Sequence, residues 1–357
     1  MLKSFDVWLF TPAFLLSLLG LLIIFSFSSQ AFGDQFIFLI IALGLFILVL
    51  FLDIHVFQAF AWILYGLSNL LLAATFIFGV ATRGSTRWLD LGFLRFQPSE
   101  VIKPFLAIAF AFFAVHLEIR KNFKDFLIFS GLFGLPFLLI FFQPDLGTTL
   151  ALTSLWGGIV LTRGLNLRMG FLLLISSLIL IPLVWGLLKP YQKQRFQTFI
   201  HPLTDPLGAS YNQIQAVIAV GSGGFLGRGL GSGSQSYLKF LPEQETDFIF
   251  ATFAEELGFL GSFLLLILYG LLFARLLYLA KKTNCEYSRL VIMAIFSFLF
   301  FQTGVHMAIN LGLLPVTGIT LPFISMGGSS LVSSWLSLGV VMAASKIDDQ
   351  KSILEIS

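Results

Sequence analysis

The segment Leu241–Phe250 places three carboxylates where a long polar stretch of the chain runs into an apolar one. Its last acidic residue, Asp247, stands directly before the apolar run. A carboxylate so close to apolar sequence is costly, and such residues usually have a function. A carboxylate can act as a general base by taking a proton from a reacting hydroxyl group. Asp247 is therefore the first candidate for a catalytic residue.

A second group of charges precedes another apolar segment. Glu100 and Lys103 are three residues apart, so their side chains can pair on one face of a helix. One interpretation is an ion pair that anchors the helix at the membrane interface. The other is that Glu100 holds Lys103 beside an anionic group, which Arg83 and Arg87 also contact.

Asp145 lies in the short polar turn 143–147, directly before an apolar segment. An aspartate in this position most often caps the N-terminus of the following helix. Contact with a substrate is the alternative interpretation.

The segment 221–235 holds seven glycines in fifteen residues. Such a backbone can cradle a phosphate group, but glycine content alone is more typical of a flexible lid. Further along, helical periodicity from Asp247 places four small residues on one face: Ala251, Ala254, Gly258 and Gly261. A stripe of small residues lets another element pack closely or leaves a groove.

Four polar residues lie inside apolar segments: Glu255, Glu256, His306 and Asn310. Polar groups at membrane depth need partners, because water is absent there. We expect all four to form hydrogen bonds with other parts of the protein.

The composition is that of a membrane protein. Of 357 residues, 57% are hydrophobic and 11% are charged, and the chain contains 43 Phe. Soluble domains average about 25% charged residues, so this composition excludes a soluble globular protein. The net charge of +3 gives no reason to expect a nucleic-acid partner.

Ten apolar segments are long enough, or nearly so, to cross a bilayer of about 30 Å. They lie near residues 7–28, 36–52, 56–80, 101–117, 126–142, 148–162, 170–188, 248–280, 289–312 and 325–345. We predict an all-α polytopic membrane protein that forms one integral membrane domain over residues 1–357. Basic residues in the short loops predict cytoplasmic N- and C-termini. A large outer loop, about 189–247, then joins the seventh and eighth helices, and the polar motifs face outward. Such a site suits a substrate with a lipid tail, a diphosphate and a polar head.

Four motifs occur in the same order as in a known family. They are Gln97-Pro98-Ser99-Glu100-x-x-Lys103, Gln143-Pro144-Asp145-x-Gly147, Leu241-Pro242-Glu243-x-x-Thr246-Asp247-Phe248 and Leu321-Pro322-Phe323-Ile324-Ser325-x-Gly327-Gly328-Ser329-Ser330. With the glycine-rich segment, they resemble the SEDS family (shape, elongation, division and sporulation), and its elongation branch more than its division branch. Glu245 and Met326 depart from the residues common in the family.

The resemblance implies a peptidoglycan glycosyltransferase that polymerises lipid II at the outer face of the bacterial cytoplasmic membrane during cell elongation. It also implies undecaprenyl-diphosphate-linked glycan as a ligand, a class B penicillin-binding protein as the partner, and Asp247 as the catalytic residue. The substrate-binding candidates are Arg83, Arg87, Glu100, Lys103, Asp145, Gln213, Lys239, Glu243, Thr246, Ser325 and Ser329. A divalent cation, Mg²⁺ or Mn²⁺, is an open alternative to basic residues for neutralising the diphosphate.

Two other functions fit a polytopic protein of this kind. One is a flippase or other transporter of lipid-linked precursors, although the polar residues gather on one side instead of near the membrane midplane. The other is a non-catalytic scaffold that recruits a penicillin-binding protein. Polymerisation of purified substrate separates all three functions.

Overall fold

The computed structural model describes residues 5–82, 85–90, 92, 95–165, 169–171, 182, 185–202, 205–206, 208, 210–233, 235 and 240–346. Nine of the described helices occupy nine of the ten predicted spans. They are α1 (Val7–Phe27), α2 (Ser29–Leu50), α4 (Ala61–Phe78), α6 (Lys103–His116), α7 (Phe123–Phe142), α8 (Leu146–Arg163), α13 (Ile249–Lys282), α14 (Glu286–Asn310) and α15 (Gly328–Ser345). Most of the remaining predicted span, near 170–188, lies outside the described residues.

The prediction of an all-α polytopic membrane protein is confirmed. Seven of the described helices are long and apolar enough to cross a membrane, and α6 is a shorter apolar helix. Large apolar side chains such as Phe259, Phe263 and Ile40 remain exposed on the outside of the bundle, as expected for lipid-facing surfaces. The exact number of ten spans stays a prediction.

The core of the bundle forms around α14 and α15. Helix α14 packs against α6, α8, α13 and α15, and α15 packs against α2. Trp335 of α15 is fully buried, and its ring contacts those of Phe10, Phe46 and Phe323. Its indole N–H donates to the Ser17 hydroxyl at 3.2 Å, so the buried polar group is satisfied.

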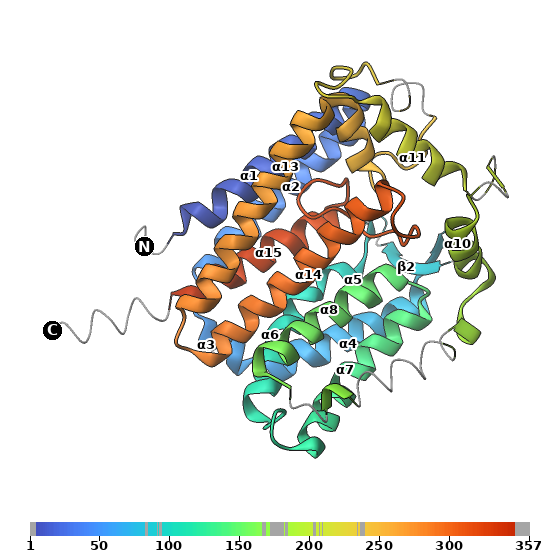
Figure 1. Ribbon diagram of the computed structural model, residues 1–357. Coiled ribbons are helices and arrows are strands. Elements are labelled where there is room, and N and C mark those ends of the chain that lie inside the picture. Colours follow the sequence, from blue (N-terminus) through green and yellow to red (C-terminus); the bar gives the residue numbers. More distant parts are fainter. Residues whose placement is uncertain are drawn as a thin grey trace.

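Short elements gather at one end of the bundle (Figure 1). They include α5 (Pro98–Val101), α10 (Pro190–Ile200) and α11 (Tyr211–Ser222), whereas α3 (Ile54–Ala59) lies at the other end. Helices α10 and α11 lie within the segment that the sequence predicted as a long loop. Helix α1 begins and α15 ends at the end that carries α3.

A small antiparallel sheet replaces part of the loop predicted between the third and fourth spans. Its strands are β1 (Val80–Thr82), β2 (Ser85–Asp90) and β3 (Arg95–Phe96), in the order β1-β2-β3. Trp88 pairs with Val80, and Asp90 pairs with Arg95. Strand β2 contacts α4 and α5, so the sheet lies against the ends of these helices.

Candidate active site

A cavity of about 420 Å³ opens at the end of the bundle that carries the sheet. Four segments line it: the sheet with the start of α5, helix α10, the turn before α13, and the loop before α15. Its charged lining residues, among those that the structure describes, are Arg87, Asp90, Arg95, Glu100, Arg195, Glu243 and Asp247. Trp88, Thr246, Thr320, Ser329 and Ser330 also contribute to the lining. The cavity therefore combines carboxylates, guanidinium groups and one indole ring.

Asp247 lies at the end of a tight turn. The N–H groups of Thr246 and Phe248 both donate to the Glu243 carbonyl oxygen at 3.2 Å, and α13 starts just beyond this turn. Asp247 Oδ2 and Arg87 Nη1 each lie 3.8 Å from the position that a Cβ atom of Gly318 would take. Asp247 Oδ2 and Arg87 Nη1 are therefore separated by at most twice 3.8 Å. Gly318 has φ +76°, a conformation that favours glycine, and its missing side chain leaves this space open.

Asp145 lies directly behind Arg87. Its Oδ1 is 3.5 Å from Arg87 Nη1, and its Oδ2 accepts from Gln97 Nε2 at 2.9 Å. The same carboxylate caps α8, accepting from the Thr148 N–H and hydroxyl at 3.2 and 2.9 Å. The predicted N-cap is therefore confirmed. Asp145 is only 1% exposed and lies outside the cavity lining, where it orients Arg87.

The predicted pair of Glu100 and Lys103 is also present. Glu100 Oε2 and Lys103 Nζ are 2.7 Å apart, and both side chains are buried. Lys103 Nζ also lies 5.4 Å from the centre of the Phe298 ring. Glu100 lines the cavity and Lys103 does not, so the lysine acts on the cavity through Glu100.

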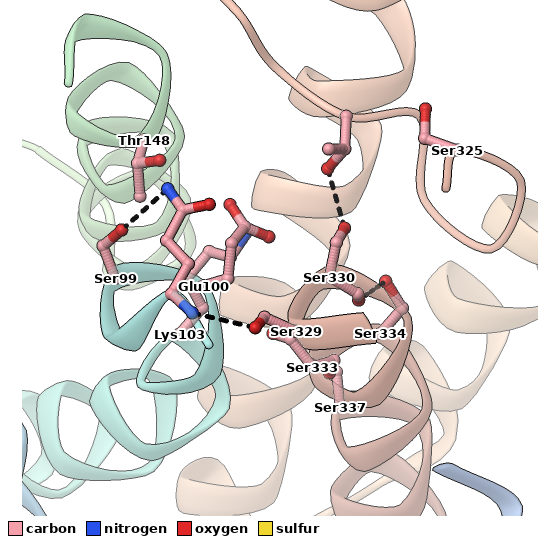
Figure 2. Close-up of polar contacts among 12 residues, drawn as sticks. Ser99, Glu100, Lys103, Thr148, Ser325, Ser329, Ser330, Ser333, Ser334 and Ser337 are labelled. Atoms are coloured by element: carbon pink, nitrogen blue, oxygen red, sulfur yellow. Dashed lines mark hydrogen bonds and ion pairs between the residues drawn. The ribbon is translucent and has the colours of Figure 1, made fainter. Parts of the chain in front are cut away.

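Helix α15 packs directly beside α5 and α6, and Ser329 in its first turn lies next to the segment that carries Glu100 and Lys103 (Figure 2). The Gln97 N–H donates to the Ser329 hydroxyl at 2.9 Å, and the hydroxyls of Thr320 and Ser330 are 2.7 Å apart. These contacts fasten the residue after strand β3 and the loop before α15 to the first turn of α15. Ser329 and Ser330 thereby become part of the cavity wall.

Ser325 joins two walls of the cavity. Its hydroxyl donates to the Thr246 carbonyl oxygen at 2.9 Å and accepts from the Leu321 N–H at 2.8 Å. Gln35 of α2 holds the same loop, since its Nε2 donates to the Ser325 carbonyl oxygen and its Oε1 accepts from the Gly327 N–H, both at 3.1 Å. The turn at Asp247 and the loop before α15 are thus fastened to each other.

Helix α13 is interrupted at Gly258, which has φ 65° and ψ −161°. In an unbroken helix, the N–H groups of Phe259 and Leu260 would donate to the carbonyl oxygens of Glu255 and Glu256. Here the glycine-rich loop supplies carbonyl acceptors for the two N–H groups and N–H donors for the two carbonyls, at distances of 2.9 to 3.1 Å. The four bonds join Phe259 to Gly224, Leu260 to Phe225, Arg228 to Glu255 and Gly229 to Glu256.

The glycine-rich segment is therefore docked onto α13, not a free-standing lid. A Cβ atom on Gly223 would lie 2.0 Å from the Ala254 carbonyl oxygen, which confirms close packing along the small-residue stripe. The prediction that Gly261 lies on the same face as Ala251 and Ala254 is wrong, because the break at Gly258 changes the helical phase.

The buried carboxylates of Glu255 and Glu256, which precede the break in α13, accept hydrogen bonds from other segments. Glu256 Oε1 accepts from the Ser26 hydroxyl at 2.7 Å, and Glu255 Oε1 accepts from the Gln235 N–H at 2.9 Å. The predicted hydrogen bonds of both residues to other parts of the protein are confirmed.

Arg195 of α10 lines the cavity and was not among the site residues predicted from the sequence. Its Nη1 donates to the Val316 carbonyl oxygen at 3.1 Å, and its guanidinium lies 5.8 Å from the Tyr191 ring centre. Burial lowers the pKa of the Arg195 guanidinium from its usual value, and the nearby charge of Asp247 opposes this shift. A signal existed in the sequence: Pro190 can start a helix that places Tyr191 and Arg195 on one face.

Comparisons with known proteins place this chain in a family. The family model FtsW/RodA/SpoVE, described as "Cell cycle protein", matches residues 7–350. The chain belongs to this family. The peptidoglycan glycosyltransferase MrdB of Escherichia coli K12 is 40% identical to this SEDS protein over 347 residues, or 93% of this chain and 92% of MrdB. A probable peptidoglycan glycosyltransferase FtsW of Coxiella burnetii is 34% identical, covering 95% of each chain.

Solved structures share the fold. A chain from a study of how a peptidoglycan synthase complex coordinates polymerization and crosslinking matches with a TM-score of 0.84 and 33% identity, covering 96% of this chain and 98% of that one. The crystal structure of the rod shape determining protein RodA of Thermus thermophilus matches with a TM-score of 0.74 and 30% identity, covering 96% and 97%.

The structure of this SEDS protein brings six of the predicted site residues to the cavity: Arg87, Glu100, Glu243, Thr246, Asp247 and Ser329. Four others, Lys103, Asp145, Gln213 and Ser325, lie outside its lining. Gln213 of α11 donates to the Leu314 carbonyl oxygen at 3.4 Å. Arg83 and Lys239 are outside the described residues. The lining residues that the prediction omitted include Trp88, Asp90, Arg95, Gln97, Arg195 and Thr320.

The described residues do not form a resident metal site. Among them, no group of three or more His, Cys, Asp or Glu residues could hold a metal ion. Mg²⁺ is often bound by one or two carboxylates together with substrate phosphates. A Mg²⁺ or Mn²⁺ held by one or two of the described cavity carboxylates would take further ligands from the diphosphate of a substrate.

Proposed function

We propose that this peptidoglycan glycosyltransferase polymerises lipid II at the outer face of the bacterial cytoplasmic membrane, with Asp247 as the general base. Membership of the SEDS family supports the reaction class, because its relatives MrdB and FtsW are named peptidoglycan glycosyltransferases. The observation that carries the residue assignment is that Asp247 lines a cavity together with three arginines, Arg87, Arg95 and Arg195.

The proposed reaction transfers a growing glycan to a new sugar. Asp247 takes the proton from the 4-hydroxyl of the acceptor sugar, and the hydroxyl oxygen attacks the anomeric carbon of the lipid-linked chain. A glycosidic bond forms as the bond from that carbon to the diphosphate oxygen breaks, with inversion at the carbon. The electron pair leaves with undecaprenyl diphosphate, and Asp247 afterwards returns its proton to water.

The leaving diphosphate carries negative charge that the cavity must offset. Arg87 and Arg195 both line it, and guanidinium groups match the geometry of phosphate oxygens. Charged groups fixed in place before the reaction stabilise developing charge without reorganising. Asp145 holds Arg87 from behind, and Val316 holds Arg195.

The charge distribution supports an outward-facing cavity. At the end of the bundle opposite the cavity, the link between α6 and α7 carries Arg120 and Lys121, and the first turn of α7 carries Lys124. Helix α13 ends there with Lys281 and Lys282. Basic residues in short loops favour the cytoplasmic side. The cavity would then open to the outer side, where a class B penicillin-binding protein could crosslink the product. The match to a chain of a peptidoglycan synthase complex supports such a partnership.

The test is polymerisation of purified lipid II in detergent by wild-type protein and by Asp247→Asn, each with its partner transpeptidase. We expect glycan strands from the wild type and at least about a hundredfold fewer from the variant, since general-base catalysis contributes about 10²–10⁴-fold. Asp53→Asn is the matched control, because Asp53 is an exposed helix cap at the other end of the bundle. Near-normal strands from folded Asp247→Asn would reject the assignment. A pure flippase or scaffold would make no strands in detergent.

A further inference from the structure

We propose that Asn310 is a positioning residue for Asp247, because it fixes the backbone of the catalytic turn from a neighbouring helix. This inference rests on the proposed role of Asp247. Asn310 is the last residue of α14 and is fully buried, so its amide must be satisfied inside the protein.

Helix α13 begins without a polar residue at its N-cap position. Phe248 occupies that position, and its ring cannot accept a hydrogen bond from the free N–H groups of the first turn. Asn310 supplies the missing cap from α14, since its Oδ1 accepts from the Ala251 N–H at 2.9 Å. Ala251 is the third helical residue, the one whose N–H a normal N-cap side chain binds.

The other half of the same amide binds the catalytic residue. Asn310 Nδ2 donates to the Asp247 carbonyl oxygen at 3.0 Å and to the His306 carbonyl oxygen of its own helix at 2.8 Å. The orientation of the amide follows from its partners, because carbonyls only accept and the Ala251 N–H only donates. Both of its N–H groups and its oxygen are therefore used.

His306, one helical turn before Asn310 on α14, holds a second backbone segment near Asp247. Its Nδ1 lies 2.8 Å from the Ile319 carbonyl oxygen, and it donates because a carbonyl can only accept. Ile319 follows Gly318, the residue that faces both the Asp247 carboxylate and Arg87. The last turn of α14 thus holds the two backbone segments that border the carboxylate.

The function of this arrangement is to fix where the base stands. Helix α14 packs against α6, α8, α13 and α15, so it is a rigid platform in the centre of the bundle. A displacement of about 1 Å can cost about a hundredfold in rate even when the chemical groups are intact. Asn310 is not among the residues that line the cavity, so it acts on catalysis through the position of Asp247.

Two substitutions separate positioning from simple stabilisation. Asn310→Leu keeps the approximate size and removes every hydrogen bond, whereas Asn310→Asp keeps an acceptor for Ala251 and loses the donors to Asp247 and His306. We expect both variants to lower kcat for lipid II polymerisation about 10- to 100-fold with KM changed less than about twofold. Asn69→Leu is the control, because Asn69 donates within its own helix α4, away from the cavity.

Hydrogen exchange gives a readout that is independent of activity. In Asn310→Leu, the Ala251 amide should exchange faster while amides beyond Gly258 on α13 keep their wild-type rates. In Asn310→Asp, Ala251 should stay protected while kcat falls, which assigns the loss to the bonds that the amide donates to Asp247 and His306 and not to the cap of α13. Uniformly faster exchange across α13 would indicate a merely structural role and overturn the proposal.

The outcomes also separate this inference from the proposed function. Normal kcat in folded Asn310 variants, with Asp247→Asn inactive, would overturn the positioning role alone. Normal strands from Asp247→Asn would instead overturn the assignment of the base.

Discussion

The backbones of Gly227 and Gly258 lie in direct contact, since a Cβ atom on Gly258 would be 2.2 Å from the Gly227 nitrogen. This contact lets the glycine-rich loop replace the helical hydrogen bonds that α13 loses at its break. The segment between Asp247 and Gly258 thereby becomes a separate half-helix that is held from the side. Asp247, the proposed base, directly precedes this half-helix and is separated by it from the long membrane-spanning part of α13.

Substitution at Gly258 should therefore destabilise the protein. Gly258→Ala places a side chain in a backbone conformation that only glycine adopts readily, at about 1–3 kcal/mol, and adds a clash with Gly227. We expect a lower unfolding temperature and weaker polymerisation, measured by thermal unfolding in detergent and by lipid II assay. Gly270→Ala on the same helix is the control, because nothing lies within 4 Å of its Cβ position. Equal unfolding temperatures for the two variants would contradict this account.

Arg195 should matter for substrate binding. In Arg195→Gln the cavity loses a guanidinium group that interacts electrostatically with Asp247, and charge-assisted hydrogen bonds contribute about 1.5–3 kcal/mol. We expect KM for lipid II to rise about tenfold or more, with partial recovery in Arg195→Lys. Lys193→Gln removes a charge from the same helix outside the cavity lining and should leave KM unchanged. An unchanged KM in Arg195→Gln would mean that the arginine only anchors α10.

The pair of Glu100 and Lys103 should be important for stability as well as activity. Lys103→Met leaves the Glu100 carboxylate buried without its partner, and breaking a buried pair costs about 3–5 kcal/mol. The double variant Glu100→Gln/Lys103→Met should recover much of this loss in thermal unfolding, while polymerisation stays low because the cavity then lacks the Glu100 carboxylate. Full activity of the folded double variant would show that the pair is only an anchor.

Gln35 should hold the loop before α15 in place. Gln35→Leu removes its bonds to Ser325 and Gly327, so the loop that is tied to Thr246 loses its anchor on α2. We expect faster hydrogen exchange at the Gly327 amide and a lower kcat. Gln30→Leu, at an exposed position of the same helix, should change neither quantity. Wild-type exchange at Gly327 in the Gln35 variant would refute the anchoring role.

Local sequence was enough to predict most of the secondary structure and the candidate base. Long apolar runs form helices in a bilayer because their backbone groups must bond internally. Asp247 could be found because it stands directly before such a run, and Asp145 because a helix that starts after an aspartate is commonly capped by it. These features depend on residues within a few positions of one another.

The composition of the cavity was decided by tertiary structure. Arg195 joins Asp247 there from a separate helix, and Gln35 reaches Ser325 across 290 positions of the chain. Periodicity carries no information on which helix ends meet, so these residues looked like ordinary polar residues in the sequence. The break at Gly258 was likewise hidden, because a glycine ends a helix only when another backbone can satisfy the groups it frees. Here that backbone is the glycine-rich loop, whose contact with α13 exists only in the folded protein.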